Sequence, residues 1–134
     1  MVEDSATDAG ELEEVLENLR ALSGEVTTAA VLSGSGKLKA STLPPGVDRK
    51  RYAAMLGALV GLARRVARES GGSSFTQTRI KEEGGHVLLV GLEGGDILAA
   101  TTGPDARVGL VLYDMRNVRR EIERMLGSRE GEQR

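Results

Sequence analysis

The chain has 134 residues, a formal net charge of −2 and a sequence pI near 5.5. This length suits one compact domain, and the acidic balance argues against a general nucleic-acid binder. Aromatic residues make up 2% of the chain and leave few rings for stacking on bases or sugars, while the absence of cysteine excludes disulfides, thiolate catalysis and cysteine-bound zinc or iron–sulfur clusters.

The N-terminal segment over residues 1–9 is small, polar and acidic, and we expect it to be flexible. It holds no basic residue, unlike the start of a signal peptide. The longest apolar run, around residues 55–63, is too short and too rich in glycine to span a bilayer. We therefore expect a cytoplasmic protein without membrane insertion, with a single domain over residues 10–127 and a charged tail over residues 128–134.

A first amphipathic helix is predicted after Asp8, with an apolar stripe that ends before Ser23-Gly24. Residues 25–33 then predict a strand whose side chains are small or apolar on both faces, which is typical of a strand covered on both sides. The Gly34-Ser35-Gly36 segment predicts a tight turn into a shorter, more polar strand over residues 37–42.

A long second helix is predicted to start at the capping residue Asp48 and to run to about Glu69. On a helical wheel its large apolar side chains cover one broad face, which we expect to contact the sheet: Tyr52, Met55, Leu56, Leu59, Val60, Leu62, Ala63, Val66 and Ala67. The opposite face carries small residues and arginines: Ala54, Gly57, Ala58, Gly61, Arg64, Arg65 and Arg68. Each glycine costs roughly 1 kcal/mol in helix propensity, so the close approach of another backbone would explain this face.

Three strand candidates follow the helix, at residues 74–81, 86–92 and 96–102, and Glu-Gly-Gly segments supply the turns between them. The second and third candidates are apolar on both faces. The first is mostly polar, and its faces are Phe75, Gln77, Arg79 and Lys81 on one side and Thr76, Thr78 and Ile80 on the other. This pattern predicts a strand at the edge of a sheet.

Pro104-Asp105 marks the start of a last helix, because proline suits the first turn and an acidic side chain favours the same end. An apolar stripe from Val108 to Met125 follows at helical spacing, and Gly127 is expected to end the helix. The predicted order is therefore helix, hairpin, long helix, three-stranded meander, helix.

Two features that could suggest a chemical site have simpler explanations. The segment from Ser33 to Lys37 lacks two requirements of a phosphate-binding P-loop, because Val31 stands where the first glycine is needed and Leu38 where a serine or threonine is needed. His86 is the only histidine, and neither metal-ligand spacing nor a nucleophile elbow accompanies it. We therefore expect no catalytic residue, no metal and no cofactor.

The basic cluster of Arg64, Arg65 and Arg68 lies at the end of the long helix. The simpler interpretation is a solvated face whose charge suits the C-terminal end of a helix. The alternative is contact with an acidic surface of a partner, or with the acidic N-terminal segment of a second subunit.

Three segments in this order resemble the Roadblock/LC7 family: AAVLSGSGK at residues 29–37, the helix segment at residues 53–65, and PDARVGLVL at residues 104–112. The resemblance extends from about Glu11 to Leu126. It implies a profilin-like α+β fold in three α/β/α layers, with the element order α-β-β-α-β-β-β-α. The five-stranded antiparallel sheet would carry the long helix on one face and the other two helices on the opposite face.

The resemblance also implies a function. Members of this family form homodimers or heterodimers through the long helix and the first strand of the meander, bind or regulate Ras-like small GTPases or act as adaptors, and share no catalytic residues. Pairing of the polar edge strand with a two-fold copy agrees with that expectation. The alternative for this strand is that its polar side chains keep the edge unpaired in a monomer.

The hypothesis is thus a non-enzymatic, homodimeric signalling protein that acts as a regulator or scaffold, binds a Ras-like small GTPase and modulates its nucleotide state. The alternatives are a profilin-like or GAF-like domain that senses a small molecule, and a structural adaptor without a GTPase. The residues expected at the dimer or partner interface are Ala54, Gly57, Ala58, Gly61, Arg65, Arg68, Phe75, Gln77 and Arg79.

Overall fold

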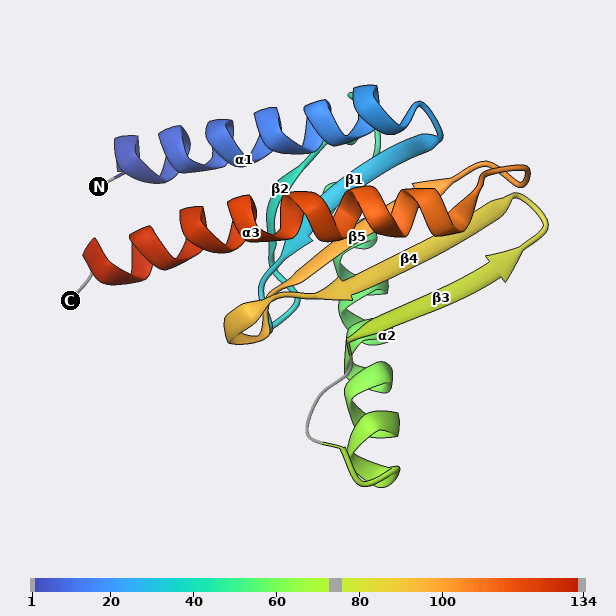
Figure 1. Cartoon of the computed structure of the whole chain (residues 1–134). Helices are drawn as coiled ribbons and strands as arrows, with labels where there is room; N and C mark the ends of the chain where they lie inside the picture. The colour runs from blue at the N-terminus through green and yellow to red at the C-terminus, as the bar shows by residue number, and fades with distance from the viewer. Residues whose placement is uncertain (1, 73–75, 133–134) are drawn as a thin grey trace.

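The computed structural model describes residues 2–72 and 76–132, and side chains over residues 10–72 and 76–127 (Figure 1). Its elements are α1 (Val2–Ser23), β1 (Val26–Leu32), β2 (Leu38–Ser41), α2 (Arg49–Glu69), β3 (Gln77–Glu82), β4 (Gly85–Gly91), the short 3₁₀ helix η1 (Glu93–Gly95), β5 (Ile97–Thr102) and α3 (Val108–Glu132). The predicted order of helices, hairpin and meander is confirmed.

The strands form one antiparallel sheet in the order β2-β1-β5-β4-β3. The β1–β2 hairpin and the β3–β4–β5 meander meet where β5 pairs with β1, so that Ala30 faces Ala99 and Val31 faces Leu98. Strand β3 lies at one edge, as its polar side chains predicted. The described edges of the sheet are therefore β2 and β3.

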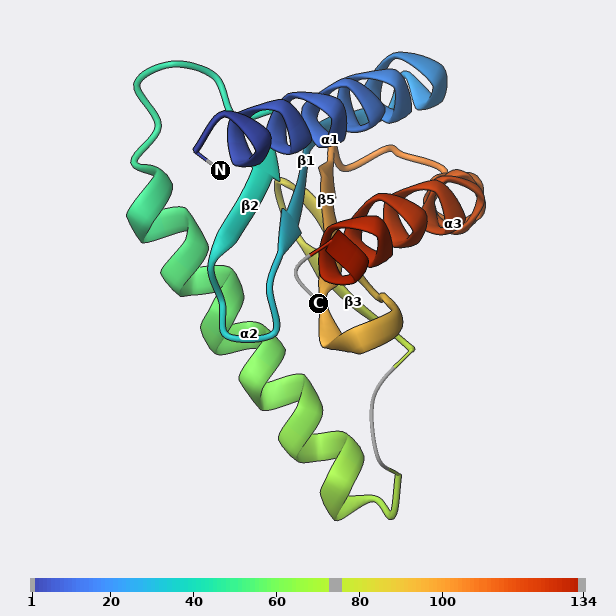
Figure 2. The same cartoon turned by 90° about the vertical axis from the view of Figure 1, so that its left-hand side faces the viewer.

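Helices cover both faces of the sheet. Helices α1 and α3 lie side by side on one face, and α2 crosses the other (Figures 1 and 2). The larger apolar cluster joins α1 and α3 to the sheet and includes Leu16, Val31, Leu88 and Met115. A smaller cluster joins α2 to the sheet and includes Ala30, Leu32, Leu56, Val60 and Leu89. The three-layer α/β/α fold is thus confirmed, and β1 is buried on both faces as its sequence predicted.

A bulge near the start of β1 changes which face Val26 occupies. Strict alternation would put Val26 on the α2 side with Ala30, but the pairing of β1 with β5 shifts register between Val26 and Thr28. Val26 consequently joins the larger cluster with Ala29. The Oγ1 atoms of Thr27 and Thr28 both lie within hydrogen-bond distance of Thr101 Oγ1, at 2.7 and 2.5 Å.

Two helix limits differ from the sequence prediction. The backbone is helical from Val2 rather than from after Asp8, because no proline interrupts this acidic segment and acidic residues favour a helix N-terminus. Helix α3 continues through Gly127 to Glu132. Gly127 does not have a positive φ, and a single glycine costs only about 1 kcal/mol in a helix, which is not enough to stop it.

An exposed pair fixes the start of α3 against β1. The carboxylate of Glu25 accepts hydrogen bonds from the Nε atom and from the backbone N–H of Arg107, both at 2.8 Å. The hydrogen bond from the Arg107 side chain, followed by that from its backbone, holds the pKa of Glu25 below its usual range. These bonds join two chain segments that are distant in sequence.

Asp48 provides the predicted cap of α2, since its Oδ1 accepts a hydrogen bond from the backbone N–H of Arg51 at 3.1 Å. We expect Asp48→Ala to lower the free energy of unfolding by about 1 kcal/mol, whereas Asp48→Asn keeps a capping oxygen and stays close to the unaltered chain. Urea unfolding followed by circular dichroism measures both variants. Equal losses in the two variants would contradict the capping role.

Candidate functional site

The outer face of α2 carries an apolar strip that the sheet does not cover. The side chains of Met55, Leu62 and Val66 are between 59% and 65% exposed. Small exposed residues accompany them, namely Ala54, Ala58 and Gly61. We call these six residues the α2 strip. A contiguous exposed apolar surface on a small protein commonly marks an interaction site.

The expectation that Met55, Leu62 and Val66 contact the sheet is therefore wrong. The apolar arc of α2 is broader than one sheet face can cover. Leu56 and Val60 are buried, and Tyr52 and Leu59 pack beside them. The phenol of Tyr52 lies 3.4 Å from Thr28 Oγ1, and burial raises its pKa. An apolar arc wider than one sheet face can be recognised in the sequence, and it indicates that the helix packs against a second surface besides the sheet.

Gly57 does not lie on the outer face, contrary to the prediction. It faces the β1–β2 turn, where a Cβ atom added to Gly57 would be 3.3 Å from the Cα atom of Gly36. Gly36 has a φ of +90°, a conformation that favours glycine. The two glycines let the helix backbone lie close to the turn. Gly61, in contrast, has nothing within 4 Å of such a Cβ atom and belongs to the α2 strip.

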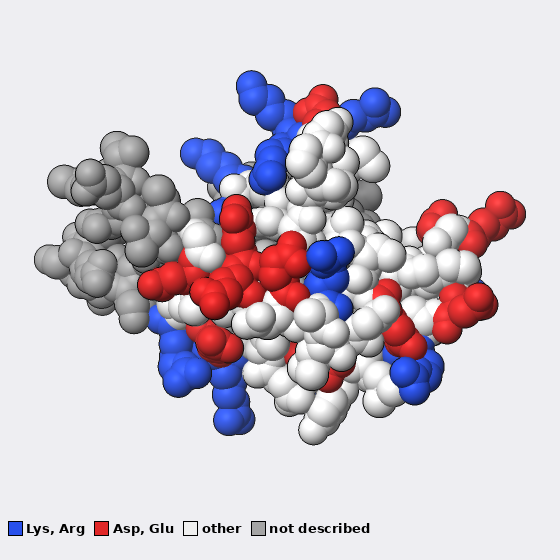
Figure 3. Space-filling view, turned by 90° about the horizontal axis from the view of Figure 1, so that it is seen from above, with Lys and Arg blue, Asp and Glu red and all other residues white. Residues whose placement is uncertain are grey.

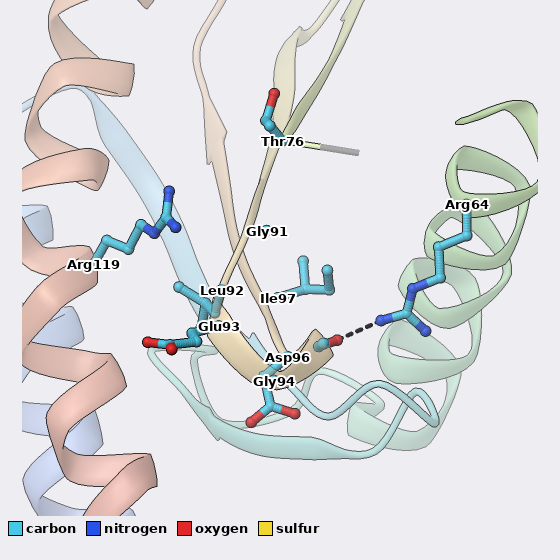
Figure 4. A pocket seen from close by; sticks show the side chains of 10 residues that line it. Arg64, Thr76, Gly91, Leu92, Glu93, Gly94, Asp96, Ile97 and Arg119 are labelled. Atoms are coloured by element: carbon cyan, nitrogen blue, oxygen red, sulfur yellow. Dashed lines mark hydrogen bonds between the residues drawn. The ribbon is translucent and has the colours of Figure 1, made fainter. Parts of the chain in front are cut away.

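Arg64 also differs from its predicted role in a solvated basic face. Its Nη1 donates to the carbonyl oxygen of Gly34 at 2.8 Å, and its Nη2 donates to the carbonyl oxygen of Gly95. Figure 4 shows the guanidinium reaching from α2 to the turn that precedes β5. Arg64 thus joins α2 to two turns at the same end of the sheet.

The other two arginines of this cluster remain at the surface. Arg65 forms an exposed ion pair with Glu69, with 3.6 Å between Nε and Oε1, and Arg68 is exposed. An exposed pair of this kind contributes under about 1 kcal/mol, so a partner could displace Glu69 from Arg65 at little cost. Arg65 and Arg68 flank the C-terminal half of the α2 strip.

Strand β3 presents the second part of the candidate surface. Gln77, Arg79 and Lys81 are exposed, and within the described part of the chain β3 pairs with β4 alone. Ile80 is 36% exposed and, because it pairs with Val87, it points to the α2 side of the sheet. Phe75, which was predicted at this interface, lies outside the described residues.

A hollow of about 520 Å³ lies between α2 and α3 at the η1 end of the sheet. Arg64 and Arg119 stand on its opposite sides (Figure 4). Two of its charged groups are paired with residues outside the lining: Asp96 accepts from Lys39 at 2.9 Å, and Arg119 donates to Glu123 at 3.2 Å. Four of its ten lining residues are charged, unlike the mostly apolar pockets that bind small molecules.

The Gly34-Ser35-Gly36 segment forms the predicted hairpin turn. The backbone N–H of Ser33 donates to the carbonyl of Lys37 at 2.8 Å, and the Lys37 N–H donates to Ser33 Oγ at 3.0 Å. The serine hydroxyl and the lysine amide are thus used within the turn.

His86 is buried in β4, and its Nδ1 has no hydrogen-bond partner among the described atoms. In the described residues, acidic side chains and histidine form no group of three or more that could hold a metal ion. No described helix combines the length and apolar character needed to cross a bilayer.

Comparison with known proteins gives consistent matches. A family model described as "Roadblock/LC7 domain" matches residues 11–102. An uncharacterised protein of Methanocaldococcus jannaschii is 35% identical over 95 residues, which cover 71% of this chain and 82% of that protein. The family match runs from α1 to β5 and includes both α2 and β3.

Two solved structures show the same fold. MglB of Myxococcus xanthus superimposes with a TM-score of 0.80 at 14% identity, covering 89% of this chain and 90% of that chain. A Roadblock/LC7 domain from Streptomyces avermitilis gives a TM-score of 0.64 at 28% identity, covering 83% of this chain and 97% of that chain.

The two α2 glycines supply a matched test of this geometry. Gly57→Leu forces a side chain into the backbone of the β1–β2 turn, and we expect it to lower the free energy of unfolding by roughly 1–3 kcal/mol. Gly61→Leu points into open space within one chain. At a protein concentration low enough to keep the chain monomeric, we expect it to leave the free energy of unfolding unchanged or raise it by up to about 1 kcal/mol through helix propensity. Urea unfolding measures both, and equal effects would contradict the placement of Gly57.

Proposed function

The chain belongs to the Roadblock/LC7 domain family, and from that membership we propose that it is a non-enzymatic homodimer that binds a Ras-like small GTPase and modulates its nucleotide state. The proposal places this activity in the cytoplasm, as part of a signalling system. The observation that carries it is the exposed α2 strip. The function is accordingly one of surface contact.

The α2 strip suits a second copy of the same helix. A two-fold axis near the middle of the strip brings each large side chain close to small residues of the partner helix. Ala58 and Gly61 allow the backbones to approach, while Met55, Leu62 and Val66 supply the apolar area. Burial of apolar surface gains about 25 cal/mol per Å², which favours a closed dimer.

The edge strand β3 supports the same symmetry. Its outer side offers backbone N–H and C=O groups to another strand, and proteins usually pair or protect such edges. A copy related by the two-fold axis would pair β3 with β3 and extend the sheet across both subunits. Ile80 would then add apolar contact on the α2 side.

Regulation of the GTPase would follow from unequal affinity for its two nucleotide states. A dimer that binds one state more tightly shifts the population towards that state. Arg65 and Arg68 lie beside the α2 strip and would contact an acidic surface of the GTPase. Any change in hydrolysis or exchange rate would come from repositioned groups of the GTPase itself. The polar hollow at η1 does not favour the small-molecule-sensing alternative.

The dimer contact predicts opposite outcomes for two valine substitutions. Val66→Glu places an acidic side chain within the α2 strip, and the symmetry duplicates it across the contact, so we expect the sedimenting mass to fall from dimer to monomer. Val47→Glu introduces the same charge at an exposed position outside the strip and should leave the mass unchanged. Circular dichroism checks that both variants keep the fold. A Val66→Glu variant that remains dimeric would overturn this contact.

Partner binding is tested with small GTPases from the same source, loaded with GDP or with a non-hydrolysable GTP analogue. We expect the chain to retain one nucleotide state preferentially, and Val66→Glu to weaken retention while Val47→Glu does not. Failure of every such GTPase to bind in either state would count against the proposed partner and leave the dimer test unaffected.

A further inference from the structure

Helices α1 and α3 form an outer layer on the sheet face opposite to α2 (Figures 1 and 2). The exposed side of α1 is acidic, with Glu11, Glu13, Glu14 and Glu17. Figure 3 shows a cluster of acidic side chains on this side of the molecule. The exposed side of α3 is mainly basic, with three arginines and one acidic residue, Glu121. Its residues Arg116, Arg120 and Arg124 form no ion pair with another side chain of the described set.

One end of this layer is apolar. The exposed fractions of Leu22, Leu110 and Tyr113 range from 50% to 73%. Helices α1 and α3 run antiparallel, so the last turn of α1 and the first turns of α3 lie at the same end of the layer (Figure 1). The layer thus has an apolar end, followed by an acidic helix beside a basic one.

The exposed residues of α1 that continue from this apolar end form one stripe. Glu11, Glu14, Asn18 and Leu22 follow one another at intervals of three or four residues and therefore share one side of the helix. Glu13 lies on the other flank, where it lines a groove with Lys39 and Lys50. The stripe consequently points away from β2.

Helix α3 carries a second stripe with the complementary chemistry. Tyr113, Asn117, Arg120 and Arg124 are exposed and also follow at intervals of three or four residues. At 1.5 Å per residue, Arg120 and Arg124 lie about 10.5 and 16.5 Å from Tyr113, while Glu14 and Glu11 lie about 12 and 16.5 Å from Leu22. An antiparallel match of the two stripes gives the pairs Leu22–Tyr113, Asn18–Asn117, Glu14–Arg120 and Glu11–Arg124.

We propose that the α1–α3 layer is a second self-association surface, on which α1 of one copy lies along α3 of another. A two-fold axis parallel to the helices places α1 of each copy against α3 of the other copy. Rotation about this axis leaves the height of each residue along the helices unchanged, so every residue pair forms twice. The surface lies on the opposite side of the sheet from the α2 strip, and both can be occupied at once. Occupation of both extends the assembly beyond a dimer.

The chemistry of the two faces determines how this contact behaves. The outer ends of its ion pairs are exposed, and exposed pairs are individually weak and screened by salt. The apolar end adds only a few side chains. Association through this layer is therefore reversible, dependent on concentration and strongest at low ionic strength, unlike the apolar contact proposed for α2.

Complementary charge reversal tests the proposal in the Val66→Glu background, which removes the α2 contact without touching this layer. The parent should gain mass with concentration at about 0.01 M ionic strength and lose that gain at about 1 M, where the screening length falls to roughly 3 Å. The variants Arg120→Glu/Arg124→Glu and Glu11→Lys/Glu14→Lys should each stay at the parent's high-salt mass. Their equimolar mixture should recover the larger mass, because each α1 then meets an α3 of opposite charge.

The matched control is Glu13→Lys, which reverses a charge on the other flank of α1, beside Lys39 and Lys50. It should keep the self-association of the parent and should not rescue the arginine variant. A parent with equal mass at both ionic strengths, or a mixture of the stripe variants that stays at the mass of its components, would overturn the proposal. Neither result bears on the α2 contact, since that contact is removed in every sample.

Discussion

The packing of α2 against the sheet decides which surfaces this molecule presents to its surroundings. Leu56 and Val60 bury their side chains against the sheet, and the paired glycines Gly36 and Gly57 let the helix lie close to the β1–β2 turn. Arg64 then holds the helix to the carbonyls of two turns. Because these contacts orient α2, they also decide which of its side chains remain exposed.

This orientation separates the molecule into two chemically different faces. On the α2 side, large apolar residues alternate with alanine and glycine, a combination that suits close contact between helices. On the α1–α3 side, the large apolar cluster is fully internal and the outer surface is mainly charged. Apolar contacts persist in salt and charged contacts do not, so the associations proposed for the two faces would differ in strength and in their response to ionic strength.

The titratable groups with clear shifts have structural roles rather than chemical ones. The lowered pKa of Glu25 reflects its bonds to Arg107, which fix the start of α3. The raised pKa of Tyr52 reflects its burial under α2. Both groups lie away from the polar hollow at η1. The two pKa shifts therefore report contacts that hold α2 and α3 in place.

Local sequence patterns sufficed for the order of elements, the Asp48 cap, the hairpin turn and the polar edge strand. Each of these depends on residues that are close together in the chain or on a simple alternation. Resemblance of three segments to the Roadblock/LC7 family supplied the five-stranded sheet and its layers. The helix limits at Val2 and Glu132 departed from prediction because single polar or glycine residues only shift a helix equilibrium slightly.

Residue spacing alone showed that α2 has a broad apolar arc, a small-residue face and a group of arginines. The packed fold was needed to show that Met55, Leu62 and Val66 face outward while Gly57 and Arg64 face the turns. The physical reason is that helical periodicity fixes the angles between side chains but not the rotation of the helix about its axis. That rotation is set by the shape of the sheet and turns against which α2 packs.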